Sequence, residues 1–310
     1  MAAARIPVIF DTDIGDDIDD LYALYLALFH PRLELIAVTT VHGDTQRKAR
    51  LAAKALRLAG RSEIPIGAGI EMSESRIKRH QRNPFPQDHA TYHVYVKPSD
   101  PENSRTYPKA IDVIRAAFAK ATAPVAIVGE GALSNVAQFI QCASAGEKSK
   151  IKCISLMGGE TGRVMSEFNI LCDPEAADVV LNSGLPVFMG TFDLTSQLYL
   201  TMEQVESHFG GSKSGPLQVI YECTKLWEPR KGPKPGPVLY DLAPVFWLAE
   251  PARIKTRPST VRVELEGTYT RGQTVRVAEE GPVLESMDLD PQALVRDFVQ
   301  IIQNGAKNGD

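Results

Sequence analysis

Residues 7–21 read Pro7-Val-Ile-Phe-Asp-Thr-Asp-Ile-Gly-Asp-Asp-Ile-Asp-Asp-Leu21, an apolar run followed by six carboxylates within ten residues. The apolar run is typical of a buried strand. The apolar residues that come next have the spacing of one helical face: Leu21, Leu24, Tyr25 and Leu28. The acids therefore occupy a strand-to-helix turn. In open α/β sheets, ligands bind at this carboxyl end of the strands.

The acid cluster favours a bound cation. Carboxylates held this close repel one another, and no Lys or Arg occurs between Arg5 and Arg32. Several carboxylate oxygens at one turn suit a hard divalent ion such as Ca²⁺ or Mg²⁺. The simpler alternative is that residues 16–20 are helix caps and first-turn acids on a solvated loop, which accounts for one or two of them.

Composition narrows the class of protein. The chain has 310 residues, 44% of them hydrophobic, which suffices for a sizeable core. A net charge of −4 gives no reason to expect nucleic acid or an anionic membrane as a partner. We find no signal-peptide pattern and no apolar run of about 20 residues, so we expect a cytoplasmic protein without a membrane span. The scattered cysteines match no zinc spacing and are expected to be reduced thiols.

Strand and helix patterns alternate along the chain. We therefore expect one α/β domain spanning residues 1–310, with a doubly wound, mainly parallel central sheet and helices on both faces. Strands are expected at 7–11, 33–41, 64–66, 123–128, 151–157 and 185–189, with a hairpin of strands 259–266 and 272–277. Helices are expected at 20–29, 46–58, 107–121, 136–141, 174–181, after the capping-box pattern of Thr201 and Gln204, at 242–248 and at 291–302.

Two segments lack a clear period. Residues 71–105 are polar and contain proline, together with His89 and several aromatic residues. Such a long irregular stretch is either a lid over the site, with His89 near the substrate, or a surface insertion. Residues 225–237 are rich in Pro, Gly and Lys and are expected to form an exposed loop.

Several motifs occur together in one order: the Asp-Thr-Asp-x-Gly opening with a later Asp-Asp, residues 37–43 (Ala-Val-Thr-Thr-Val-His-Gly), 131–135 (Gly-Ala-Leu-Ser-Asn), 156–159 (Leu-Met-Gly-Gly), 167–169 (Glu-Phe-Asn) with 173–177 (Asp-Pro-Glu-Ala-Ala), Asp241 before an apolar helix, and 266–274 (Glu-Gly-Thr-Tyr-Thr-Arg-Gly-Gln-Thr). Over residues 7 to 275 the chain resembles the nucleoside hydrolase family, the inosine–uridine preferring group and its relatives. The acidic opening and the Glu-Phe-Asn block are the most specific of these motifs.

The resemblance implies hydrolysis of the N-glycosidic bond of ribonucleosides, in purine and pyrimidine salvage, by a homo-oligomer that holds Ca²⁺. It implies metal ligands at Asp13, Asp20, Asp241 and the backbone carbonyl of Glu130, and Asp13 would also be the general base. Asp19, Glu167 and Asn169 would hold the sugar. These roles are chemically coherent, because glycosidic cleavage builds positive charge on the sugar and needs negative charge nearby.

The chain departs from the family pattern at several positions. The spacing from Asp13 to Asp19-Asp20 is two residues longer than in the best-known members, so Asp16 or Asp17 could take over a ligand role. Asp44 stands where those members have an Asn and is expected near the substrate. Tyr240 stands where the inosine–uridine group has a His, so we expect the Tyr240 ring to stack on the leaving base.

Two other functions remain open at this stage. Haloacid-dehalogenase-like phosphatases also carry Asp-x-Asp after a strand, with the first Asp, here Asp11, as nucleophile. Against this, Gly15 stands where that group has Thr or Val. The other alternative is a non-catalytic, Ca²⁺-containing sugar-binding protein on the same scaffold.

Overall fold

The computed structural model describes residues 4–72, 92–227 and 234–307. Its centre is an eight-stranded sheet with the order β3-β2-β1-β4-β5-β6-β8-β7. Neighbouring strands are parallel except β7 and β8, which pair antiparallel at one edge. The strands are β1 (Ile6–Thr12), β2 (Leu33–Thr40), β3 (Ile66–Ala68), β4 (Val125–Glu130), β5 (Ile151–Met157), β6 (Val187–Gly190), β7 (Ile254–Val263) and β8 (Thr274–Leu289).

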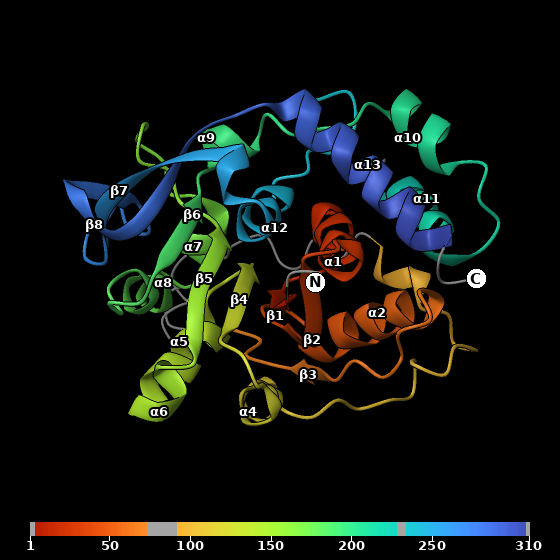
Figure 1. Ribbon diagram of the computed structural model, residues 1–310, viewed down its shortest axis with the longest axis horizontal. Coiled ribbons are helices and arrows are strands. Elements are labelled where there is room, and N and C mark those ends of the chain that lie inside the picture. The colour runs from red at the N-terminus through yellow and green to blue at the C-terminus, as the bar shows by residue number, and fades with distance from the viewer. Residues whose placement is uncertain (1–3, 73–91, 228–233, 308–310) are drawn as a thin grey trace.

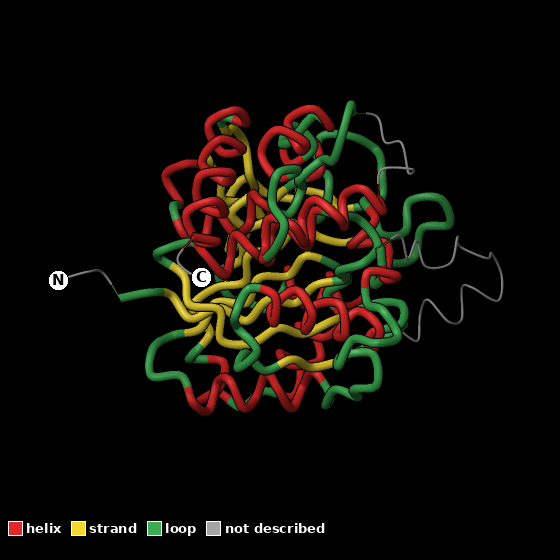
Figure 2. Tube along the Cα trace, turned by 90° about the vertical axis from the view of Figure 1, so that its right-hand side faces the viewer, coloured by secondary structure: helices red, strands yellow, loops and turns green. Residues whose placement is uncertain are grey.

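Helices cover both faces of this sheet, as Figures 1 and 2 show. Along β1, the side chains of Val8 and Phe10 pack with α1, α2, α12 and α13, whereas Ile9 packs with α4, α5 and α8. Strand side chains alternate between faces, so a strand buried on both sides is apolar throughout. The longer helices are α1 (Asp19–Phe29), α2 (Thr45–Leu58), α4 (Ala110–Lys120), α5 (Ser134–Cys142), α8 (Pro174–Leu181), α10 (Met202–Phe209), α11 (Gly215–Trp227), α12 (Leu242–Ala249) and α13 (Pro291–Lys307).

Short helical segments complete the described chain: α6 (Ala145–Lys148), α7 (Phe168–Cys172), α9 (Phe192–Thr195) and the 3₁₀ turns η1 (His93–Tyr95) and η3 (Pro251–Arg253). Of these, α7 and α9 follow β5 and β6 and therefore lie at the carboxyl edge of the sheet, where they shape the site. Among the described residues, no helix combines the length and the apolar character needed to cross a membrane.

The expected doubly wound sheet is confirmed, with corrections at particular elements. Strand 64–66 was placed too early, since β3 begins at Ile66, and the helix expected at 107–121 begins only at Ala110. The hairpin is present, but its second strand continues to Leu289 because it also pairs with β6. Residues 73–91, in the predicted lid or insertion, and 228–233, in the predicted exposed loop, lie outside the described residues.

Candidate active site

A cavity of about 300 Å³ opens at the carboxyl edge of the sheet. It lies beside β1 and β4, where the strand order changes direction, which is the usual ligand position in doubly wound folds. Side chains from all the acidic motifs reach it. The lining residues are Asp13, Asp16, Asp17, Asp19, Asp20, Glu130, Met157, Glu167, Phe168, Asn169, Phe192, Tyr240 and Asp241.

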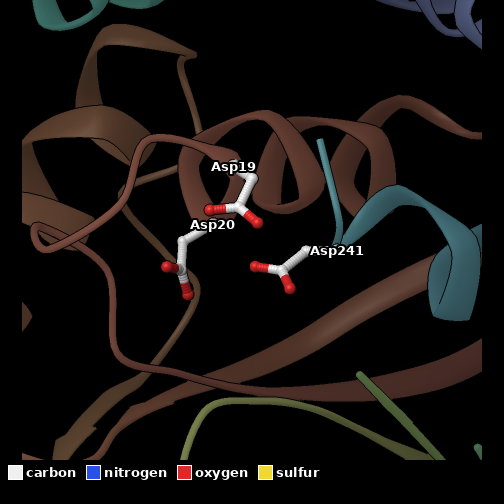
Figure 3. A group of neighbouring side chains, drawn as sticks. All are labelled: Asp19, Asp20 and Asp241. Carbon is white, nitrogen blue, oxygen red and sulfur yellow. The ribbon is translucent and has the colours of Figure 1, made fainter. Parts of the chain in front are cut away.

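Three carboxylates in this cavity are placed to hold a metal ion. Asp19 and Asp20 start α1, and Asp241 precedes α12, yet each offers an oxygen such that the three atoms lie within 4.8 Å of one another. Figure 3 shows the three side chains converging from these two segments. All three are buried, with 2–4% of each residue exposed. Carboxylates from distant parts of the chain converge in this way only if something offsets their repulsion.

Asp13 and Glu130 add two more buried acids to the same cavity. Burial is the main reason why the pKa of Asp13 is raised to about 7, although the nearby Lys48 opposes the shift. Burial also raises the pKa of Glu130 well above its usual value. Contacts of the Glu130 carboxylate with Asp241 and with the backbone of Met157 oppose this rise.

The donor set therefore fits a hard divalent cation. Burial and mutual repulsion raise the pKa of Asp19, Asp20 and Asp241 as well, so a bound cation would offset the cost of ionising them. An all-oxygen set of carboxylates is the preference of Ca²⁺ or Mg²⁺ rather than of a soft transition metal. The solvated-loop alternative does not hold for most of this cluster, because only Asp17 of the four acids in residues 16–20 is more than marginally exposed.

The turn that carries the acids, residues 13–18, is fixed by side chains from elsewhere in the chain. Lys48 on α2 is fully buried; its Nζ donates to the backbone oxygen of Asp13 and lies 2.8 Å from Asp16 Oδ2. From the other side, the Tyr92 hydroxyl accepts from Gly15 N at 3.1 Å and donates to the oxygen of Asp17 at 3.0 Å. The contacts of Lys48 and Tyr92 with this turn were not predicted from the sequence, because no motif links these residues to a turn that far away.

Gly15 is required at its position in this turn. Its φ is +111°, and a Cβ there would lie 2.4 Å from a ring atom of His93. The same His93 ring lies 3.8 Å from Asp16, measured from Nε2 to Oδ1. Burial alone would raise the pKa of Asp16, but His93 and Lys48 together lower it to about 2. Asp16 is therefore ionised at neutral pH.

Glu167 and Asn169 lie on the opposite wall and are held rigidly. Glu167 is the N-cap of α7, and its carboxylate accepts from the backbone N–H groups of Gly159, Asn169 and Ile170 at 3.0, 2.9 and 3.2 Å. The Asn169 amide donates to Met157 O at 3.2 Å. Glu167 is 3% and Asn169 8% exposed, so both are nearly buried polar groups facing a cavity.

Aromatic rings form the remaining wall. Tyr240 and Phe192 stack with centroids 5.5 Å apart and ring planes 19° apart, and Phe168 also lines the cavity. Burial, followed by the negative charge of Asp19 and Asp17, raises the pKa of the Tyr240 phenol above its usual value. A neutral phenol beside a flat partner ring suits stacking better than proton donation at neutral pH. Phe192 and Phe168 were not singled out in the sequence.

Of two further residues predicted near the substrate, Asp44 lies outside the cavity lining and His89 lies outside the described residues. Asp44 is exposed and caps α2, where its side chain accepts from Arg47 N at 2.9 Å; it is not among the lining residues. The reason is local, since a free helix N-terminus needs an acceptor.

Asp11 is also absent from the lining. It is 1% exposed and accepts hydrogen bonds from Thr39 and Asn135, so the cavity lacks the nucleophile that a phosphatase would need.

The comparisons with known proteins agree with this geometry. The model of the inosine–uridine preferring nucleoside hydrolase family matches residues 8–301. A non-specific ribonucleoside hydrolase of Escherichia coli (strain SMS-3-5 / SECEC) is 31% identical over 279 residues, which cover 87% of this chain and 88% of the relative. Among solved structures, the purine-preferring ribonucleoside hydrolase from Gardnerella vaginalis superposes with a TM-score of 0.82 at 25% identity, over 97% of this chain and 99% of its own. The chain belongs to the inosine–uridine preferring nucleoside hydrolase family.

Proposed function

We propose that this protein hydrolyses the N-glycosidic bond of ribonucleosides to the free base and ribose, and that it does so with bound Ca²⁺. The observation that carries the proposal is the convergence of Asp19, Asp20 and Asp241 in a buried cavity whose other walls are sugar-type hydrogen-bonding groups and aromatic rings. Family membership and the ribonucleoside hydrolases among the relatives support it.

The cation would be held by Asp20, Asp241 and Asp13, with the backbone carbonyl of Glu130 adding a further oxygen. Asp19 contributes to the same cluster, and we assign it chiefly to a ribose hydroxyl. When bound, a divalent cation supplies Lewis acidity toward water and oxygen ligands. Ca²⁺ is preferred over Mg²⁺ here because it accepts more carboxylate ligands in a less regular arrangement.

Asp13 is our candidate for the general base that takes a proton from the attacking water. It sits in the cavity and is held at its backbone by Lys48. Positive charge would build on the sugar ring as the base departs ahead of the attacking water, and the surrounding carboxylates would stabilise that charge. Water attack needs no covalent intermediate on the protein, which agrees with the position of Asp11 outside the cavity lining.

The sugar would be positioned between the acid cluster and α7. The Glu167 carboxylate and the Asn169 amide both line the cavity, and hydrogen bonds to the backbone hold each group in place. Tyr240, backed by Phe192, offers a flat surface for the base. We assign no general acid for the leaving base. We also retain the expected cytoplasmic location, role in salvage and homo-oligomeric state as parts of the proposal; the four free thiols support a reducing compartment.

The test is an activity panel. The untreated protein is assayed against purine and pyrimidine ribonucleosides and against p-nitrophenyl phosphate, each with and without a chelator. We expect hydrolysis of ribonucleosides that is lost in chelator and restored by Ca²⁺, and no phosphatase activity. Ca²⁺ binding without turnover on any nucleoside would instead indicate a sugar-binding protein. Phosphate release would indicate the phosphatase alternative.

A further inference from the structure

Lys48 is an unusual residue to find beside a cluster of buried acids. It is a lysine with 0% exposure on α2, and its ammonium group contacts the turn that carries the acids. A buried ammonium loses its hydration, which costs several kcal/mol unless good partners replace the water. A cation there also competes with any metal ion for the same carboxylates. Its retention needs a reason.

The partners of Lys48 suggest that reason. One N–H of the ammonium donates to the backbone oxygen of Asp13, and the group pairs with Asp16 Oδ2 at 2.8 Å. The first contact holds the main chain of the candidate general base. The second holds the middle of the 13–18 turn. Because both contacts start from one atom on a regular helix, the position of the Asp13 backbone is set relative to α2.

Asp16 has a basic side chain facing each of its carboxylate oxygens. Oδ2 faces Lys48, and Oδ1 faces His93 Nε2 at 3.8 Å. The sequence left open whether Asp16 takes over a metal-ligand role in the lengthened turn. In the structure its charge is already directed at Lys48 and His93, while the three acids that converge on one point are Asp19, Asp20 and Asp241.

We propose that Lys48 is a positioning residue, which together with its counter-ion Asp16 clamps the acidic turn so that the Asp13 carboxylate faces the cation and the attacking water. Asp16 then serves the clamp and is not a metal ligand. This inference rests on the proposed function for its catalytic consequence, but the clamp itself is tested through metal binding and stability.

The first experiment compares Lys48→Met with Lys54→Met. Lys54 is a second buried lysine on α2, 7% exposed. Its Nζ pairs with Asp100 Oδ2 at 2.7 Å and not with an acid of the 13–18 turn. We expect Lys48→Met to weaken Ca²⁺ binding, measured by calorimetry, by at least ~10-fold, the size of effect seen when a group supporting a metal ligand is lost. We expect kcat to fall ~10²-fold with much less change in KM, as for a misplaced catalytic group.

The sign of the change in Ca²⁺ affinity separates positioning from charge balance. If Lys48 only neutralised the acids, its removal would leave the site more negative and Ca²⁺ would bind more tightly. Tighter or unchanged binding in Lys48→Met therefore overturns the proposal. Lys54→Met should lower the melting temperature but keep the wild-type Ca²⁺ affinity and kcat. Equal loss of affinity in both variants would show a general effect of disturbing α2, and would also overturn it.

A double variant keeps the proposal testable if Lys48→Met folds poorly. Lys48→Met alone leaves Asp16 with an uncompensated charge, whereas Lys48→Met/Asp16→Asn removes both charges. The double variant should recover most of the melting temperature but not the Ca²⁺ affinity or kcat, because the Asp13 backbone still lacks its donor. Recovery of all three would show that the pair is only a structural ion pair.

Asp16→Asn alone decides the role of Asp16. An Asn oxygen still accepts from Lys48, so Ca²⁺ affinity should change much less than in Lys48→Met. A loss of Ca²⁺ affinity as large as that of Asp13→Ala would identify Asp16 as a metal ligand and overturn its assignment to the clamp. Absence of nucleoside hydrolysis by the wild-type protein would refute the proposed function instead, and calorimetry and melting would still report on the clamp.

Discussion

Asp11→Asn gives a direct measure of what burial costs one acid that lies beside the site without lining it. The Asp11 side chain accepts from Thr39 at 2.6 Å and from Asn135 at 2.8 Å through Oδ1, while no residue in the described part of the chain donates a hydrogen bond to the buried Oδ2. Burial raises the pKa of Asp11 from 3.8 to about 7, against the lowering effect of those two hydrogen bonds. An Asn keeps the accepting oxygen and cannot ionise.

The sign of the pH dependence follows from proton binding. Between pH 3.8 and about pH 7 the unfolded chain has released the Asp11 proton while the folded protein retains it, so a rise in pH favours unfolding. Each pKa unit corresponds to about 1.4 kcal/mol, and the full gap therefore corresponds to about 4 kcal/mol. The stability of wild type relative to Asp11→Asn should fall by up to this amount from pH 4 to pH 7, and stay level above pH 7.

The assay is urea unfolding of both proteins at several values between pH 5 and pH 8, in chelator. The buried amide of the Asn adds a cost of roughly 1–3 kcal/mol that does not vary with pH, so the slope alone reports the titration. Comparing the two proteins at each pH cancels most of the contribution of the other acids. A stability difference that is the same at pH 5 and pH 7 would refute the argument from burial. Asp11→Asn should also keep nucleoside hydrolysis, whereas the phosphatase alternative makes Asp11 the indispensable nucleophile.

Three further predictions concern the cation, the sugar and the base. Chelation should lower the melting temperature of wild type, because a cation at 100 times its Kd stabilises the folded protein by about 2.7 kcal/mol. Asp241→Ala should abolish both this response and turnover. A wild-type protein that stays fully active and equally stable in chelator would contradict the prediction. Ribonucleosides should exceed 2′-deoxyribonucleosides in kcat/KM by roughly 10⁴-fold, because Asp19, Glu167 and Asn169 would lose a partner; equal rates would show that the sugar assignment is wrong. Tyr240→Phe should keep most activity and Tyr240→Ala should lose a stacking contribution of roughly 1–3 kcal/mol. A loss of ~10²-fold in Tyr240→Phe that spares p-nitrophenyl riboside would instead make the phenol the general acid.

The sequence predicted the sheet well where hydrophobic period and turn residues agree. The strand at 151–157 and the helix at 174–181 have the predicted bounds, the latter because Asp173 caps it and Pro174 occupies its first turn. The continuation of β8 through Gly281 and Pro282 was not predicted, because those residues are typical of turns. Pairing of residues 283–285 with β6 outweighs that local preference. Helix α11 was missed altogether.

The candidate site, like the fold, could be predicted from the sequence only in part. Acids that follow strand ends are brought to one cavity by the topology of a parallel sheet, so Asp13, Glu130 and the start of α1 could be anticipated from local pattern. The contacts of Lys48 and Tyr92 with the 13–18 turn join residues 35 and 77 positions apart. Only the packing of α2 and of the segment after residue 91 creates them, and neither residue type signals such a contact in a sequence.

The position of β8 between β6 and β7 has a consequence for the order in which the protein is built on the ribosome. Residues 187–189 of β6 have their outer edge covered by residues 283–285, and those emerge from the ribosome much later. Until then, β6 presents the unpaired backbone groups of a parallel edge strand, which is a template for pairing with other chains. The nascent chain therefore passes through a long interval of synthesis in which its sheet is open at β6, and aggregation during expression is expected to depend on how soon the C-terminal β7–β8 hairpin follows.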